Sequence, residues 1–515
     1  MGCGSDGRGW RVTRGGRGVF PGFVTKQKNT TAAGASIEDV LDCTARADAL
    51  VSGVLTGVMT QRRAVGTALD YVRALSRKVA GNCWSMSETA GHEGPHRMQS
   101  LLRSYKWSWE KARAALPALA AACLADDPGD RIGPGVAFDE TADLKKGSST
   151  ACVSPQHAGV TGKVENCVSW VFAALVTASG QAWADFDMYM PDCWAKDPGR
   201  RRKAGIPGRL KFATKPDLAI AQLRRLAASG LRFFWVAADE VYGRSGLFRE
   251  TCRELSLAYV MIIPCDYRVT IAGKISVRAD GMINDAVFER RSCGNGTKGP
   301  RYGDWAMIAT ARPREFLLIR RLDREKNPYT FYLCWAPEGR PATMTYFITI
   351  AGRRWPVEVT FKTAKDTLSW DQSQVRTWQA MNRHTVLTAL AQARTAAIRG
   401  ALAGTVTLPG SPGDSPPAAP DRPCEDDAAD TDLDVPRGDA PLPAYAGQPC
   451  PAGIPPVRLS DAESLRISND TTDYAAGLLS RARLAFRRRW SRWRRRHQAR
   501  ARWHHYSSRI QAMAT

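Results

Sequence analysis

The sequence predicts an α/β protein in which helices precede a sheet-containing catalytic domain. From about 131 to 265, short apolar runs typical of strands alternate with helical segments, as in GVAF before Asp139 and LRFFWVAA before Asp239. From 36 to 128 the apolar residues recur at helical spacing instead. We therefore expect a helical N-terminal domain over 36–128 and an α/β domain over 129–403.

The remaining segments differ in composition. Residues 1–35 are rich in Gly, Arg and Thr and predict a disordered basic leader. Between about 265 and 350, FLLIRRL, TFYLCW and TYFITIAG read as strands, and the chain from 351 to 403 reads as helices. Residues 404–470 form a Pro-rich acidic linker, and residues 471–515 form an Arg- and Trp-rich basic tail.

The charge balance indicates a polyanionic partner. The 515 residues carry a formal net charge of +23, with a pI near 9.7. Nucleic acid is the first candidate and an anionic membrane the second, while a solvated basic face remains the bland alternative. In the tail, Arg488, Trp490, Trp493 and Arg495 are candidate DNA contacts, since arginine neutralises phosphates and tryptophan stacks on bases. A solvated tail that binds any polyanion is an equally good interpretation.

Cysteine and histidine usage excludes several classes of protein. The 13 cysteines form no Cys-x-x-Cys pair, and only 7 histidines are present, so neither a zinc knuckle nor a disulfide framework fits. Apolar runs such as 168–176 are too short to span a bilayer, and the N-terminus lacks the apolar core of a signal peptide. We expect a cytoplasmic protein with reduced thiols and no membrane partner.

Three carboxylates suggest a metal centre. Asp139 and Asp239 each follow an apolar strand, where a side chain reaches the rim of a sheet, and Glu358 lies in RRWPVEVTFKTAK. Such a set can hold two Mg²⁺ ions, one activating the attacking oxygen of a phosphodiester reaction and one stabilising the leaving oxygen. Mn²⁺ suits the same oxygen ligands. For a single Asp at a strand end, a turn or a helix cap is the competing role.

Several motifs, in the same order, resemble those of the DDE transposases of bacterial insertion sequences. The matching stretches are Asp139-Glu140-Thr141, Leu144-Lys145-Lys146-Gly147, Gly162-Lys163-Val164-Glu165-Asn166-Cys167, Met188-Tyr189-Met190-Pro191 with Trp194, Phe212-Ala213-Thr214-Lys215-Pro216 and Ala238-Asp239-Glu240-Val241-Tyr242-Gly243. The resemblance covers about residues 95–400 together with the basic tail. It implies that residues 129–403 form an RNase H-like catalytic domain with Asp139 and Asp239 as its first two acids, and that the helical domain over 36–128 binds DNA.

A third block resembles the Tyr-Arg-Glu-Lys signature of the cut-and-paste branch of that family. Arg354, Glu358 and Lys365 keep its spacing, whereas Ala351 stands where the tyrosine would fall. The resemblance implies that Glu358 completes the metal site and that Arg354 and Lys365 contact phosphates near the scissile bond. A solvated helix face is the alternative for those two cations. The 119 residues from Asp239 to Glu358 exceed what a bare RNase H-like core needs, so the stretch from about 265 to 350 is expected to be a β-rich insertion.

The resemblance implies a transposase that acts on double-stranded DNA. It would bind terminal inverted repeats, cleave the element ends by two-metal hydrolysis and join the 3′-hydroxyls to target DNA. A homodimer on DNA is expected because two ends are paired, and the protein would then be associated with the nucleoid. A catalytically silent DNA-binding protein or repressor is the alternative, favoured weakly by Ala351 and by Val359, where a second glutamate is frequent. A structure-specific nuclease is a third interpretation.

Overall fold

The computed structural model describes residues 36–409, apart from 78–80, 125–128, 272–274, 297–298, 323–327 and 355. The expected leader, almost all of the linker and the whole basic tail lie outside the described residues. So do the four tail candidates Arg488, Trp490, Trp493 and Arg495. Among the described helices, none combines the length and the apolar character that crossing a membrane requires.

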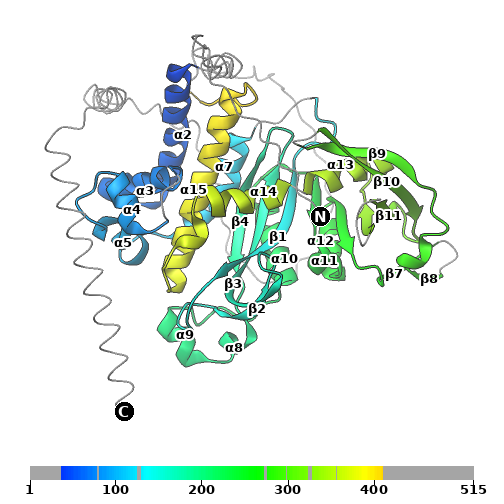
Figure 1. The fold of residues 1–515 in the computed structure, drawn as a ribbon, viewed down its shortest axis with the longest axis horizontal. Coiled ribbons are helices and arrows are strands. Elements are labelled where there is room, and N and C mark those ends of the chain that lie inside the picture. The colour runs from blue at the N-terminus through cyan, green and yellow to red at the C-terminus, as the bar shows by residue number, and fades with distance from the viewer. Residues whose placement is uncertain are drawn as a thin grey trace, which may run out of the picture.

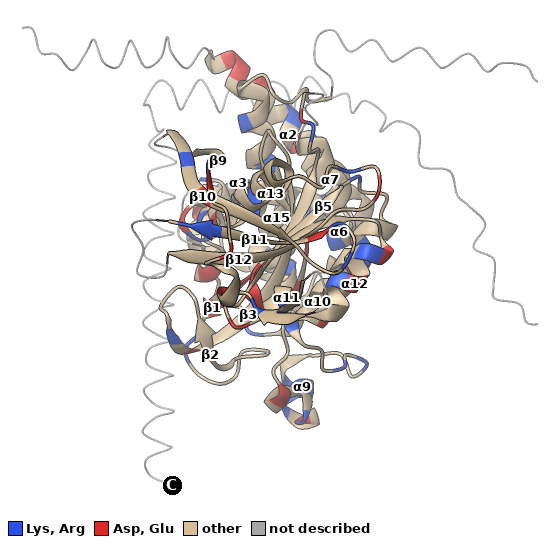
Figure 2. Cartoon of the chain, turned by 90° about the vertical axis from the view of Figure 1, so that its right-hand side faces the viewer, with Lys and Arg blue, Asp and Glu red and all other residues tan. Residues whose placement is uncertain are grey.

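The predicted α/β class is confirmed, with helices first and a large mixed sheet after them (Figure 1). The first helices are α2 (Ile37–Val58), α3 (Arg62–Leu75), α4 (Cys83–Thr89), α5 (His96–Arg103), α6 (Trp109–Ala114) and α7 (Leu116–Cys123). The later helices are α8 (Asp192–Ala195), α9 (Pro198–Ala204), α10 (Lys215–Ala228), α11 (Glu240–Gly243), α12 (Gly246–Glu254), α13 (Met344–Arg354), α14 (Pro356–Lys362) and α15 (Trp378–Leu402). Helices α8 and α9 stand away from the sheet, and α9 is strongly basic (Figure 2).

Five consecutive strands form the part of the sheet that carries the acids. They are β4 (Gln181–Met188), β3 (Lys163–Val176), β1 (Gly135–Leu144), β5 (Trp235–Ala238) and β6 (Ala258–Ile263). Strand β3 runs antiparallel to both β4 and β1, whereas β1, β5 and β6 run parallel to one another. Parallel pairing directs the carboxyl ends of β1, β5 and β6 to one edge of the sheet.

The β-rich segment after β6 continues the same sheet. Strand β12 (Tyr329–Trp335) pairs antiparallel with β6, and β11 (Glu315–Arg321), β10 (Gly299–Ala309) and β9 (Glu289–Gly296) follow in that order. Strand β2 (Ser154–Ala158) pairs with β3, while β7 (Arg268–Thr270) and β8 (Ser276–Arg278) form a separate hairpin. Strands β12, β11, β10 and β9 therefore extend the main sheet, and only the β7–β8 hairpin of the described strands in this region is separate from it.

One strand prediction was wrong. The segment TYFITIAG lies within helix α13, not in a strand. Its Tyr346, Phe347 and Ile350 are buried at helical spacing, so packing overrides the β propensity of the run. The close approach of α13 to β9 depends on Gly352, where an added Cβ would lie 1.8 Å from the backbone oxygen of Cys293. The helix ends at Arg354, and its path therefore positions that side chain.

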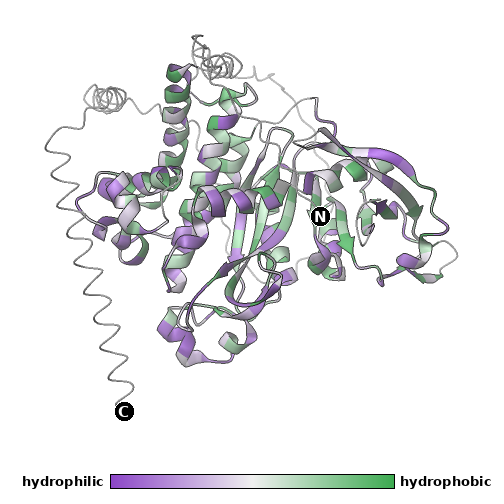
Figure 3. Cartoon of the chain, in the orientation of Figure 1, coloured by the Kyte–Doolittle hydropathy of each residue, from purple (hydrophilic) through white to green (hydrophobic). Residues whose placement is uncertain are grey.

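Helices cover both faces of the sheet. One apolar cluster joins the face of Val136 and Phe138 to α10, α11 and α12. The other joins the face of Ala137 to α15 and the N-terminal helices. Figure 3 shows the apolar strands enclosed between helices with more polar outer surfaces. A sheet covered on both sides explains why its central strands read as continuous apolar runs.

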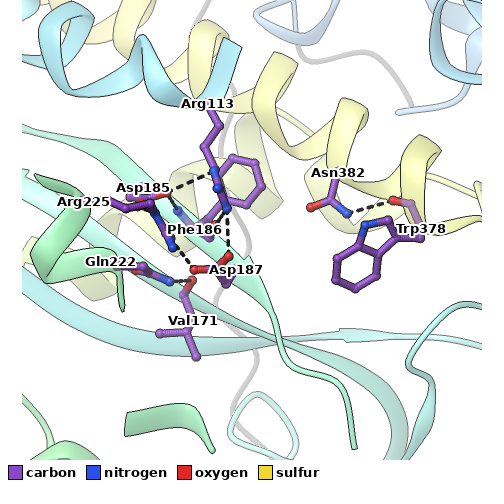
Figure 4. Close-up of polar contacts among 9 residues, drawn as sticks. All are labelled: Arg113, Val171, Asp185, Phe186, Asp187, Gln222, Arg225, Trp378 and Asn382. Atoms are coloured by element: carbon purple, nitrogen blue, oxygen red, sulfur yellow. Dashed lines mark hydrogen bonds and ion pairs between the residues drawn. The ribbon is translucent and has the colours of Figure 1, made fainter. Parts of the chain in front are cut away.

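Buried polar contacts attach the N-terminal helices to α15 and to the sheet. Asp48 on α2 accepts hydrogen bonds from Arg394 of α15 and from Arg73 of α3. On β4, Asp185 and Asp187 contact both Arg113 of α6 and Arg225 of α10 (Figure 4). Asp185 is almost fully buried, and its pKa is raised mainly by that burial. These contacts fix the helices against the sheet that carries the first two acids.

Candidate active site

Strand pairing brings the first two acids together. Phe138 and Ala238 lie opposite each other on the parallel strands β1 and β5, so Asp139 and Asp239 occupy neighbouring positions. Asp239 directly follows β5, as predicted, but the prediction that a strand ends before Asp139 was wrong, because β1 continues to Leu144. Asp139 is only 8% exposed, and its Oδ1 accepts a hydrogen bond from the Glu140 amide at 2.8 Å. Asp239 Oδ1 accepts from the Val241 amide at 3.0 Å and caps α11. The expected alternative role, a helix cap, is thus present at Asp239 alongside its place beside Asp139.

The third block approaches these acids from α13 and α14. Arg354 Nη2 lies 3.5 Å from Asp139 Oδ2, and Arg354 Nη1 lies 3.6 Å from Glu358 Oε1. The Arg354 side chain is 14% exposed, whereas that of Glu358 is 46% exposed. The guanidinium therefore stands between the two carboxylates and partly neutralises both.

The electrostatics show a surplus of negative charge. The pKa of Asp139 is raised to about 7, mainly by burial and also by the Asp239 and Glu358 carboxylates, while Arg354 opposes the shift. The pKa of Asp239 is also raised, first by burial and then by Glu140, and Arg354 again opposes the shift. Carboxylates that raise each other's pKa are stabilised in their charged form by an added cation.

A fourth carboxylate, Glu140, was missed by the sequence reasoning. Successive strand residues face opposite sides, so Glu140 points toward α10 while Asp139 points toward α14. Lys215 Nζ, at the start of α10, lies 2.5 Å from Glu140 Oε1, while the buried Oε2 has no hydrogen-bond partner among the described residues. The adjacent Asp-Glu pair was visible in the sequence, but the approach of Lys215 had no local signal.

The chemistry of this carboxylate set fits a divalent cation. Four carboxylates (Asp139, Glu140, Asp239 and Glu358) face two cations, Arg354 and Lys215, and oxygen ligands are those that Mg²⁺ and Mn²⁺ prefer. As the side chains stand, no three acidic, histidine or cysteine residues in the described part of the chain are placed to hold one metal ion. Metal binding would therefore require side chains to turn, and the exposed Glu358 has the freedom to do so.

Lys365 lies deeper than a simple phosphate contact would suggest. It falls in a π-helical turn (Thr363–Thr367) after α14, and its Nζ donates to the Ala142 carbonyl oxygen on β1 at 3.0 Å. Burial lowers its pKa, and the nearby Asp371 and Asp143 oppose that effect. Burial also raises the pKa of Asp143 to about 7, although Lys145 lies 2.8 Å away. Lys365 thus belongs to a partly buried ionic group next to the acids.

Gly243 explains how α11 can begin directly after Asp239. An added Cβ at this position would lie 1.8 Å from the Ile262 backbone oxygen on β6. Only glycine permits the short helix to lie so close to the neighbouring strand. The Asp-Glu-Val-Tyr-Gly motif therefore combines a metal-binding candidate with the residue that seats its helix.

Comparison with known proteins agrees with this geometry. Residues 55–280 match the DDE superfamily endonuclease family, and residues 214–393 match the transposase DDE domain family. The two matches overlap across β5 and together include Asp139, Asp239 and Glu358. The part of the chain that carries the three acids is thus similar to DDE superfamily endonucleases and to transposase DDE domains.

A curated relative narrows the resemblance to insertion sequences. The chain is 30% identical over 187 residues to a probable transposase for insertion sequence element IS701 from Microchaete diplosiphon. The alignment covers 36% of this chain and 45% of the relative. The chain thus spans less than half the length of the curated relative that it matches.

Proposed function

We propose that the protein is a DNA transposase that cleaves the ends of an insertion sequence and joins the 3′-hydroxyls to target DNA. The observation that supports this most is the meeting of Asp139, Asp239 and Glu358 around Arg354 at one sheet edge. The matches to the DDE superfamily endonuclease and transposase DDE families support DNA cleavage as the reaction. The expected partners are double-stranded DNA and a second copy of the chain, and the expected location is the cytoplasm, at the nucleoid.

The chain's own residues would divide the work. Asp139, Asp239 and Glu358 would bind Mg²⁺ or Mn²⁺, which would activate the attacking oxygen and stabilise the leaving one. Arg354 would exchange its carboxylate partners for a phosphate oxygen when DNA arrives, because a guanidinium binds either anion in the same forked geometry. Lys365, which donates to the Ala142 carbonyl oxygen on β1, would add positive electrostatic potential near the acids. The tail residues Arg488, Trp490, Trp493 and Arg495 remain predicted DNA contacts.

The test is a combined cleavage and joining assay on DNA that carries the inverted repeats flanking the gene, in Mg²⁺ and in Mn²⁺. We expect cleavage at the repeat ends followed by joining to a second DNA. Binding without cleavage in either metal would instead favour the silent DNA-binding protein or repressor. Cleavage without joining would favour a structure-specific nuclease.

A further inference from the structure

A basic groove lies beside the candidate active site. It has a volume of about 510 Å³ and lies between α12, the segment that leaves β6 and the turn from β10 to β11. Four arginines and one carboxylate, Glu315, line it; the arginines are Arg249, Arg253, Arg268 and Arg312. We call it the arginine groove. Its lining carries three more positive than negative charges, and its volume is that of a ligand pocket, roughly 300–1,000 Å³.

Arg249 is a buried arginine whose positive charge has no carboxylate partner among the described residues. It is only 8% exposed, and its guanidinium forms no ion pair with any described carboxylate. It donates instead to the Gly243 carbonyl oxygen and, at 2.6 Å, to the Tyr267 hydroxyl. A buried cation held by neutral acceptors leaves its charge available to a ligand. Such an arrangement favours an anion in the groove.

The other arginines leave further positive charge. Arg253 and Arg312 both lie 3.8 Å from Glu315, so they share this carboxylate, although Arg253 also contacts Glu250. Arg268 is exposed and donates to the Ser276 backbone oxygen at 2.7 Å without a described carboxylate partner. Planar guanidinium groups recognise phosphate by paired hydrogen bonds, so phosphate is the anion that this lining fits best.

The groove begins next to α11, the helix that Asp239 caps, and extends along α12 toward the opposite edge of the sheet, where Glu315 contacts Tyr259 at the start of β6. Strands β5 and β6 are parallel, so Asp239 and the segment carrying Tyr267 and Arg268 leave the sheet in the same direction. Arg249 also holds the carbonyl of Gly243, the last residue of the helix that Asp239 caps. A nucleic-acid strand at the acids would reach the groove by crossing α11.

We propose that the arginine groove binds backbone phosphates of the DNA flanking the cleaved bond, an inference that rests on the proposed function. The groove would hold the duplex by its charge and not by its base sequence, because only phosphate contacts are offered. DNA is favoured over a free nucleotide because the groove begins beside α11, the helix that Asp239 caps, so a strand held at the acids would continue into the groove.

Arginine modification tests this directly in the full-length protein. Phenylglyoxal reacts with accessible guanidinium groups, and the modified positions are read by mass spectrometry with and without a short DNA duplex of arbitrary sequence. We expect the duplex to slow modification of Arg268 and Arg312. Arg232 is a matched control, because it is exposed and does not line the groove. Its modification should be unchanged.

Affinity measurements provide a second readout. Replacing both Arg268 and Arg312 by alanine should lower the slope of log Kd against log salt by about 2, since each phosphate contact contributes about 0.9. Arg232→Ala should leave the slope unchanged. Equal modification of Arg268 and Arg312 with saturating duplex would overturn the proposal, and so would protection by inorganic pyrophosphate but not by DNA. Protection without any cleavage by the wild type would keep the groove and refute the proposed transposase activity.

Discussion

The Arg354 guanidinium lies 3.5 Å from the carboxylate of Asp139, with Nη2 facing Oδ2. This contact places a cation inside the carboxylate cluster that we propose acts on DNA. We interpret Arg354 as a counter-charge that holds the carboxylates until metal and phosphate arrive.

Removing that counter-charge should separate metal binding from cleavage. Arg354→Ala should bind Mn²⁺ at least as tightly as the wild type without DNA, because the cation competing for Asp139 and Glu358 is gone. Cleavage should fall roughly a hundredfold, as when one charge-stabilising donor is lost. Calorimetry with Mn²⁺ and single-turnover cleavage provide the two measurements. A loss of Mn²⁺ affinity as large as that caused by Asp139→Asn would show that Arg354 has some other role.

The ion-pair group on β4 should stabilise the fold strongly. Arg225→Met would leave the nearly buried Asp185 short of a partner, and breaking a buried pair in this way costs roughly 3 kcal/mol. The matched control is Arg224→Met, whose ion pair with Glu254 is exposed on both sides and should cost less than about 1 kcal/mol. Chemical denaturation measures both. Equal losses of unfolding free energy would refute the assigned importance of the buried group.

His384 predicts a specific loss of stability in acid. Its Nε2 lies 2.8 Å from the Trp370 carbonyl oxygen, which can only accept, so Nε2 carries the proton and Nδ1 accepts from the Tyr71 hydroxyl at 2.9 Å. Burial lowers the pKa of His384 from 6.5 to about 4. Between these values the unfolded chain binds a proton that the folded chain does not. Stability attributable to this group is therefore complete above pH 6.5 and is lost as the pH falls toward 4.

The measurement is unfolding free energy against pH for the wild type and His384→Gln. The contribution of His384 across this interval is up to about 3 kcal/mol, at about 1.4 kcal/mol per pKa unit. Because other groups titrate in the same range, the informative quantity is the difference between the two proteins. The wild type should lose more stability than the variant between pH 6.5 and 4. Parallel curves would mean that the imidazole is not held neutral.

Sequence reasoning worked where a local pattern decided the structure. Asp239 follows an apolar strand and Asp139 lies within another, and the parallel pairing of those strands makes their adjacency a consequence of the fold. It did not work where distant packing decided. TYFITIAG has strand-like composition yet becomes α13, because its apolar residues pack against β5, β6 and β9 of the sheet. Glu140 was missed because its partner, Lys215, lies 75 residues away in the sequence.

The inward position of Arg354 is another feature that contacts between distant residues decide and that the sequence alone did not predict. The spacing of Arg354, Glu358 and Lys365 was readable, but not which side chains would meet. A regular helix places residues seven apart on one face, whereas the π-helical turn carries Lys365 toward Ala142 of β1. The pairing of β12 with β6, which extends the catalytic sheet, likewise depended on long-range register.

The most direct test of the metal-dependent site compares two adjacent acids. Asp239 lies at the sheet edge beside Asp139, whereas Glu240 is on the exposed surface of α11 and pairs with Arg244 at 2.8 Å. Cleavage of inverted-repeat DNA in Mg²⁺ would be measured for Asp239→Asn and Glu240→Gln, with DNA binding as the folding control. The account predicts at least about a hundredfold loss, equivalent to about 2.7 kcal/mol, for Asp239→Asn and little change for Glu240→Gln. Full cleavage by Asp239→Asn would contradict it.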